Sequence, residues 1–146
     1  MPADVGILDT SVVIQLGRIA DPAQLPRHPT ITAVTLAELS VGPLVAEDDD
    51  ERAVRQAHVQ QAEADFDPLP FDVASARAFG RVAASLRRAG RKASARAFDA
   101  MIAATAIANQ LPLYTCNPAD FTGIDGITLV PVQMAAPTRA RSSDER

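Results

Sequence analysis

The stretch Val5-Gly6-Ile7-Leu8-Asp9-Thr10-Ser11-Val12-Val13-Ile14 decides the fold that this sequence predicts. Its first four residues form a continuous apolar run, which is typical of a strand buried on both faces. A single carboxylate, Asp9, follows, and Thr10 or Ser11 can cap a helix that begins near Val12. Asp9 is therefore expected where a buried strand ends and a helix begins. In open α/β sheets, ligands bind at that edge.

Short apolar segments and longer amphipathic segments alternate along the rest of the chain. We expect strands at residues 5–8, 30–34, 113–115 and 127–130, and a brief extended segment at 69–71. We expect helices at residues 11–19, 35–41, 48–65, 73–89 and 96–109. Thr35 with Glu38 has the spacing of a capping box, and Asp72 and Gly90 fit the two ends of the fourth helix. This order predicts an α/β fold, a three-layer α/β/α arrangement with a small, mostly parallel central sheet.

The composition predicts one globular domain, residues 1–134. The chain has 146 residues, 47% of them hydrophobic, and no apolar run approaches the roughly 18 residues of a membrane span. The N-terminus runs directly into the first strand without the features of a signal peptide, and Cys116 is the single cysteine. We therefore expect a soluble, cytoplasmic protein without a disulfide. Residues 135–146 are rich in Pro, Ser and charge, and we expect them to be disordered.

The charges are unevenly distributed. The net charge is −4, and residues 47–51 are all acidic. Half of the 14 basic residues lie between positions 77 and 96, with no acid among them: Arg77, Arg81, Arg87, Arg88, Arg91, Lys92 and Arg96. Such a window is more often a solvated helix face than a binding surface, but it can also contact phosphates.

Two acids lie on apolar helical stripes that we expect to face the core. Glu38 shares a face with Val34, Val41 and Val45, and Asp99 shares one with Ile102, Ala103, Ala106 and Ile107. No Lys or Arg lies on either stripe. An isolated buried charge is costly and is tolerated mainly when it is paired or binds a metal ion.

Two further acids follow strands. Asp9 ends the first strand, and Asp120 lies just after the strand at 113–115. In a parallel sheet both strand ends open at the same edge, which the N-terminal half of the Asp99 helix can also reach. We therefore expect three or four carboxylates to converge without cationic partners. Such a cluster needs a hard divalent cation, and oxygen ligands favour Mg²⁺ or Mn²⁺ over Zn²⁺.

Each acid also has a simpler interpretation when it is taken alone. Asp9 could only cap the first helix, and Glu38 could only complete a capping box. Asp99 could be an acid favoured by the helix dipole, and Asp120 could be a turn residue. The metal-site interpretation depends on the four acids occurring together and in this order.

Four sequence segments carry a family resemblance: Leu8–Val12, Thr35–Leu39, Asp99–Ala106 and Thr115–Phe121. In this order, over nearly the whole globular part, the chain resembles PIN-domain ribonucleases of the VapC toxin type. The resemblance implies an acidic metal centre of Asp9, Glu38 and Asp99. The fourth ligand is then Asn117 or Asp120.

The resemblance also implies a reaction, a cofactor and partners. It implies Mg²⁺-dependent endonucleolytic cleavage of RNA, with Mn²⁺ able to substitute, and side chains that orient the carboxylates or bound water: Thr10, Ser11 and Thr115. It implies a homodimer joined through the helices after Glu38, and a cognate antitoxin that blocks the acidic cleft. Because the basic window leads to Asp99, we expect phosphate contacts from Arg87, Arg88, Arg91 and Lys92.

Two other functions remain open at this point. One is another Mg²⁺-dependent phosphoryl-transfer enzyme, such as a phosphatase of the haloacid dehalogenase type, although that class has an acid where this chain has Ser11. The other is a catalytically silent PIN-like RNA-binding module, which would usually have lost one of the first three acids. His28 and His58 lie away from the four segments, and we expect both at the surface. A metal-free nuclease that uses histidine is therefore disfavoured.

Overall fold

A computed structural model of the chain describes residues 4–136. At its centre is a parallel sheet of four strands in the order β2-β1-β3-β4: β1 (Val5–Leu8), β2 (His28–Thr30), β3 (Leu113–Thr115) and β4 (Leu129–Pro131). Around it lie α1 (Thr10–Val13), α2 (Ala33–Val41), α3 (Asp49–Asp65), α4 (Val73–Arg88) and α5 (Ala97–Ala108). Short 3₁₀ helices at Gly42–Val45, Ala93–Arg96 and Pro118–Phe121 join several of them.

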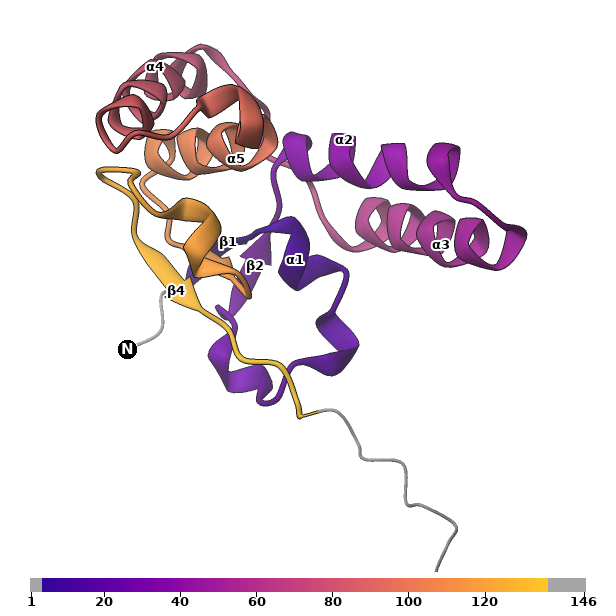
Figure 1. Ribbon diagram of the computed structural model, residues 1–146. Helices are drawn as coiled ribbons and strands as arrows, with labels where there is room; N and C mark the ends of the chain where they lie inside the picture. Colours follow the sequence, from indigo (N-terminus) through magenta and orange to yellow (C-terminus); the bar gives the residue numbers. More distant parts are fainter. Residues whose placement is uncertain (1–3, 137–146) are drawn as a thin grey trace, which may run out of the picture.

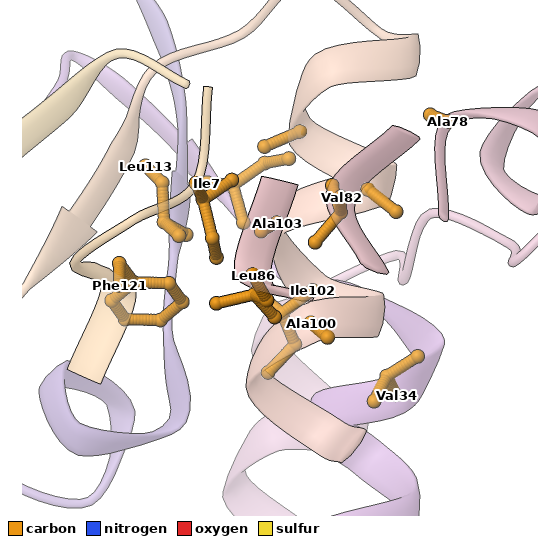
Figure 2. Packing of buried hydrophobic residues seen from close by; sticks show 13 residues of the cluster. Ile7, Val34, Ala78, Val82, Leu86, Ala100, Ile102, Ala103, Leu113 and Phe121 are labelled. Carbon is orange, nitrogen blue, oxygen red and sulfur yellow. The ribbon is translucent and has the colours of Figure 1, made fainter. Parts of the chain in front are cut away.

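The central strands bury opposite faces of the sheet with successive residues. Ile7 and Leu113 pack with the buried residues of α4 and α5, as Figure 2 shows. Leu8 and Tyr114 point to the other face, where they pack with buried residues of α1, α2 and α3. Helices therefore cover both faces, and the predicted three-layer α/β/α fold is confirmed.

Helix α5 lies against α4 and the sheet with a face of small residues. Ala100, Ala103, Ala104 and Ala106 are fully buried, as is Ile102 between them. Small side chains let the helix backbone approach its neighbours closely, so the position of α5 is narrowly determined. Asp99 lies in the first turn of this helix.

Helices α2 and α3 form a hairpin that extends away from the sheet (Figure 1). Asp48 caps α3 by accepting a hydrogen bond from the Glu51 backbone N–H at 2.7 Å, and Arg55 donates to the carbonyl of Gly42 at 3.0 Å. The predicted helix at 48–65 is therefore confirmed to within one residue. Exposed apolar side chains lie at and near the turn of the hairpin: Val41, Leu44, Val45 and Val54.

The predicted ends of the first strand and helix were partly wrong. Val5 is exposed, and burial begins at Gly6. Helix α1 ends at Val13, not at residue 19, because Val12, Val13 and Ile14 are β-branched and favour helix weakly. The cap is neither hydroxyl residue but Asp9, whose carboxylate accepts a hydrogen bond from the Val12 backbone N–H.

The second strand and its helix also differ from the prediction. β2 ends at Thr30, and α2 begins at Ala33 with Thr32 as its cap. The Thr32 hydroxyl accepts a hydrogen bond from the Thr35 backbone N–H at 3.1 Å, so the predicted capping box of Thr35 and Glu38 is wrong. Both threonines could fill the same role, and the earlier one does so. Glu38 is thereby left free for another partner.

The remaining boundaries agree closely with the prediction. Asp72 caps α4 through the Ser75 backbone N–H at 2.9 Å, and Gly90 follows the helix with φ +76°. The last helix and last strand are each displaced by one or two residues. No helix within residues 4–136 is both long and apolar enough to cross a membrane. Most of the predicted disordered tail, residues 137–146, lies outside the described part of the chain.

Gly6 and Tyr114 fit together across β1 and β3. A Cβ atom added at Gly6 would lie 2.4 Å from Cε2 of the Tyr114 ring and 3.1 Å from Pro26. Distances that short are overlaps, so the ring occupies the space that a side chain at position 6 would need. The absence of a side chain at Gly6 therefore lets the two central strands pair with Tyr114 buried between them.

Candidate active site

Asp9 is a buried acid surrounded by neutral hydrogen-bond donors. Its side chain is 4% exposed and accepts bonds from the Ser11 hydroxyl, from the Val12 backbone N–H at 3.2 Å and from the Thr115 hydroxyl at 2.6 Å. Thr115 reaches it because β1 and β3 are parallel neighbours. Burial raises the pKa of Asp9, and the bonds from Ser11 and Thr115 oppose that rise.

Glu38 lies in the middle of α2 and turns toward α1. The Thr10 hydroxyl donates to its Oε1 atom at 2.8 Å and lies 3.1 Å from the Thr35 hydroxyl. Burial raises the pKa of Glu38, the charge of Asp9 raises it further, and the bond from Thr10 opposes both. The two acids are thus close enough to repel each other.

The predicted apolar stripe of Glu38 is only partly buried. Val34 is buried, but Val41 and Val45 are 46% and 61% exposed. They are exposed because the end of α2 and the following turn belong to the part of the hairpin that extends beyond the sheet (Figure 1). Glu38 therefore lies at the border of the core and not within it.

Asp99 is the third residue of α5, and its predicted stripe is buried except for Ile107, which is half-buried. Ile102, Ala103 and Ala106 are fully buried beside it. Burial is the largest cause that raises the pKa of Asp99 to about 6, followed by the charges of Asp120, Glu38 and Asp9. The charges of the other three acids therefore all reach Asp99.

Arg96 contradicts the expectation that the acids converge without a cationic partner. Its Nη1 atom lies 2.7 Å from Oδ1 of Asp120 and 3.8 Å from Oδ2 of Asp99. The guanidinium opposes the rise of the Asp99 pKa. Arg96 lies three residues before Asp99, a spacing that puts both on one face of the predicted helix at 96–109, so the prediction that no basic residue shares the face of Asp99 was wrong.

Residues 115–117 join β3 to the turn that carries Asp120. The Thr115 hydroxyl accepts a bond from the Asn117 backbone N–H at 2.9 Å, and the Asn117 side chain is exposed. The Cys116 backbone N–H donates to the Ser11 hydroxyl at 3.1 Å, and burial raises the pKa of the Cys116 thiol. A raised thiol pKa lowers the thiolate fraction, as expected of an unreactive cysteine.

The four acids do not form a finished metal-binding shell. Within the described residues, no three Asp, Glu, His or Cys side chains are grouped closely enough to hold one ion. The donors nevertheless suit a hard divalent cation, because all are carboxylate oxygens and their charges repel one another. The residues present therefore fit such a cation in charge and in ligand chemistry.

The basic residues expected to contact RNA lie on and after the end of α4. Arg88 pairs with Asp125 at 3.1 Å, and Arg91 donates to the Thr122 carbonyl at 2.6 Å. Arg87 and Lys92 are exposed. Two of these four basic residues therefore contact the loop between β3 and β4.

A groove adjoins the acids on the side of α1 and α3. It encloses about 320 Å³, and its lining includes Thr10, Glu38, Leu39, Val54 and His58. His28 is exposed as predicted, whereas His58 is half-buried in this groove. Sequence periodicity could not reveal the groove, because it forms only where the α2–α3 hairpin meets α1.

Known proteins are similar to this chain in sequence and in fold. The PIN domain family model matches residues 7–126. The chain belongs to the PIN-domain family. Within that family it is 41% identical to "Ribonuclease VapC5" of Mycobacterium tuberculosis over 129 residues, 87% of this chain and 93% of the relative. It is 36% identical to "Ribonuclease VapC8" of the same species over 102 residues, 70% of this chain and 90% of the relative.

A solved structure extends the agreement to three dimensions. The crystal structure of VapBC-5 from M. tuberculosis, a member of the VapBC family of toxin-antitoxin systems, superposes with a TM-score of 0.76 and 37% identity. The match covers 88% of this chain and 99% of that one. The PIN-domain prediction is thereby confirmed. Of the three functions left open by the sequence, the VapC-type ribonuclease is the one that these relatives support.

Proposed function

We propose that this VapC-type PIN-domain protein is an endoribonuclease toxin that cleaves RNA with a Mg²⁺ ion held by Asp9, Glu38, Asp99 and Asp120. The ribonuclease class follows from the family. The observation that supports these four residues is the raised pKa of Asp99: burial is its largest cause, and the charges of the other three acids raise it further. Four acids that repel one another at the carboxyl edge of a parallel sheet are a ligand set in need of a cation.

When bound, Mg²⁺ supplies a water of lowered pKa as nucleophile and stabilises negative charge on the phosphate oxygens. The protein's contribution is to hold the carboxylates. Ser11 and Thr115 orient Asp9, and Thr10 orients Glu38. All three hydroxyls are neutral, so they fix the acids without cancelling the charge that attracts a cation. Mn²⁺ has similar ligand preferences, and we expect it to substitute.

We propose Asp120, and not Asn117, as the fourth metal ligand. The charge of Asp120 is the strongest of the three that raise the pKa of Asp99, so its carboxylate lies within electrostatic reach of the site. Asn117 is exposed and carries no charge. It contributes through its backbone, which donates to the Thr115 hydroxyl.

RNA would approach along the basic segment that joins α4 to α5. We propose phosphate contacts from four side chains there: Arg87, Arg88, Arg91 and Lys92. The contacts of Arg88 and Arg91 within the protein do not remove their charge, which still acts on a nearby phosphate. Because RNA is the substrate, we propose the cytoplasm as the compartment.

The proposed antitoxin partner would use the groove beside Glu38. Thr10 and Glu38 form its polar end, and Leu39 and Val54 contribute apolar surface. A partner seated there would cover one of the proposed metal ligands. The exposed apolar tip of the α2–α3 hairpin, with Leu44 85% exposed, supports a separate homodimer contact.

The decisive experiment compares two acid-to-amide variants in RNA cleavage. Purified wild-type protein should cleave single-stranded RNA with Mg²⁺ and stop when EDTA is added, and Asp99→Asn should lose activity more than about 100-fold, since even residues that only orient ligands cost 10–100-fold. Asp49→Asn is the matched control, because Asp49 is an acid in the first turn of α3 that also pairs with an arginine. Sequencing of the RNA ends would then reveal the cleavage sites.

Two outcomes would contradict the proposal. Cleavage by Asp99→Asn at the wild-type rate would remove this acid from the mechanism. Tight RNA binding by the wild-type protein without any cleavage would instead favour the catalytically silent module.

A further inference from the structure

Arg96 lies between two of the four acids and contacts both. Its Nη1 atom is within hydrogen-bond distance of Asp120 and 3.8 Å from Asp99. Both carboxylates belong to the metal site proposed above. A guanidinium and a metal ion repel each other, so both cannot occupy the space between these carboxylates.

The position of Arg96 is set by two segments that are docked on each other. Arg91 donates to the Thr122 carbonyl at 2.6 Å, and a Cβ added at Gly123 would lie 2.8 Å from the Ala89 Cβ. The turn before Arg96 and the loop that carries Asp120 are therefore in close contact. This docking brings Arg96 and Asp120 near each other, although they are 24 positions apart in the chain.

Arg96 nevertheless has room to move. Its side chain is 41% exposed, whereas those of Asp99 and Asp120 are 27% and 34% exposed. The arginine can turn toward solvent while the two acids stay in place. A guanidinium released at this rim is suited to bind a phosphate, because its planar donors match two phosphate oxygens.

We propose that Arg96 is a positioning residue with two alternating partners. Without a metal ion it holds Asp99 and Asp120 together. When a divalent cation binds, Arg96 yields those oxygens and turns to a phosphate of the RNA backbone. This inference rests on the proposed function of the same site.

The proposal predicts opposite effects of one substitution on metal binding and on cleavage. Arg96→Gln should bind Mn²⁺ about tenfold more tightly in the absence of RNA, because it removes a unit charge that competes with a divalent ion. The same variant should melt at a lower temperature than wild type in EDTA. At saturating Mg²⁺ the kcat/KM of Arg96→Gln for single-stranded RNA should fall about tenfold. Arg96→Lys keeps the positive charge, so its Mn²⁺ affinity and its kcat/KM should lie between those of wild type and Arg96→Gln.

Arg52→Gln is the matched control. Arg52 pairs with Asp49 three residues before it in the first turn of α3, the same spacing as Arg96 and Asp99. We expect Arg52→Gln to leave Mn²⁺ affinity and cleavage unchanged. A general effect of net charge would move both arginine variants alike.

The outcomes separate this inference from the proposed function. The metal site stands if wild type binds Mn²⁺ and Asp9→Asn does not. If, in that case, Arg96→Gln binds Mn²⁺ no more tightly than wild type does, the inference about Arg96 is overturned. Unchanged cleavage by Arg96→Gln would likewise overturn the phosphate contact. If neither wild type nor Arg96→Gln binds Mn²⁺, the proposed metal site itself fails, and the inference fails with it.

Discussion

The two halves of the acidic site are held in different ways. In the Asp9–Glu38 half, the donors are three hydroxyls and a backbone N–H, all of them neutral. In the Asp99–Asp120 half, the donor is the guanidinium of Arg96. The first half is deeper in the protein, with Asp9 only 4% exposed, and the second opens to solvent.

The two kinds of donor act differently on the carboxylates that they hold. Hydroxyls fix the direction of a carboxylate and leave its charge intact, so the Asp9–Glu38 half is prepared for a cation before one arrives. An arginine neutralises charge but must give way to a cation. The Asp99–Asp120 half is therefore the part of the site that we expect to rearrange.

Among the hydroxyl groups that hold the Asp9–Glu38 half, Thr115 should show the largest effect when it is replaced, in Thr115→Val. This near-isosteric change removes the hydroxyl that donates to Asp9 and accepts from the Asn117 backbone. We expect RNA cleavage to fall by about 10–100-fold. Steady-state cleavage at several Mg²⁺ concentrations would measure it.

Thr105→Val is the control for that change. Thr105 is also fully buried, but its hydroxyl bonds only to the Met101 carbonyl of its own helix at 2.9 Å. We expect normal cleavage from this variant. Equal losses in both variants would mean that the effect of Thr115 reflects a weakened fold and not the orientation of Asp9.

The Asp99–Asp120 half should give the reaction its dependence on pH. Because the pKa of Asp99 is about 6, protons compete with the metal ion for this carboxylate below that value. Cleavage at limiting Mg²⁺ should rise with pH and be about tenfold slower at pH 5 than on the plateau. A rate that is flat between pH 5 and 7 would show that Asp99 is already ionised there.

The same acid should weaken the metal-free protein as pH rises. The folded-state pKa of Asp99 is raised from 3.8 to about 6, so the folded state binds more protons than the unfolded state between these values. Its stabilising contribution is complete below pH 4 and is lost as pH rises through 6, by at most about 3 kcal/mol. Urea unfolding in EDTA at pH 5 and pH 7 would measure the loss.

Asp99→Asn should remove most of this pH dependence and be more stable than wild type at pH 7. Asp49→Asn should change neither the pH dependence of stability nor the stability at pH 7, because Asp49 lies at the exposed start of α3. A lower stability of Asp99→Asn at pH 7 would show that the pairing with Arg96 outweighs the repulsion from the other acids.

The smallest effect should come from the exposed basic residues at the edge of the second half. Replacing Arg87 and Lys92 with Ala should weaken RNA binding and make the logarithmic salt dependence shallower by about one unit. Binding titrations between low and high salt would measure the slope, with Arg52→Ala as the control. An unchanged slope would exclude these two side chains from phosphate contact.

Much of the fold, and the gathering of acids around Asp99, could be predicted from local sequence patterns. Burial could be predicted from the apolar run before Asp9 and from the stripe of small residues beside Asp99. The gathering of acids at one edge could be predicted because parallel strands end on the same side of a sheet. Cap positions were harder, because Thr32 and Thr35 could each cap α2 and only tertiary packing chose between them. Local sequence pattern therefore predicts an element well where burial of its apolar residues determines it. It predicts a helix cap poorly where two residues can both serve as the cap.

Arg96 shows what the sequence could not provide. Its spacing of three residues from Asp99 was visible in the sequence, and the predicted helix at 96–109 places both on one face. Its contact with Asp120, 24 positions away along the chain, depends on tertiary packing and could not be predicted from local pattern. The groove beside Glu38 was missed for the same reason, since its walls come from three separate helices.

The fit of Gly6 against the Tyr114 ring has a consequence for relatives of this chain. A side chain at position 6 would overlap the ring, so the two positions share one fixed volume. Homologues that carry Ala at the first position should therefore carry a smaller residue at the second, and the two should vary together. Such coupled variation in a family alignment would disclose the pairing of β1 with β3 without any coordinates.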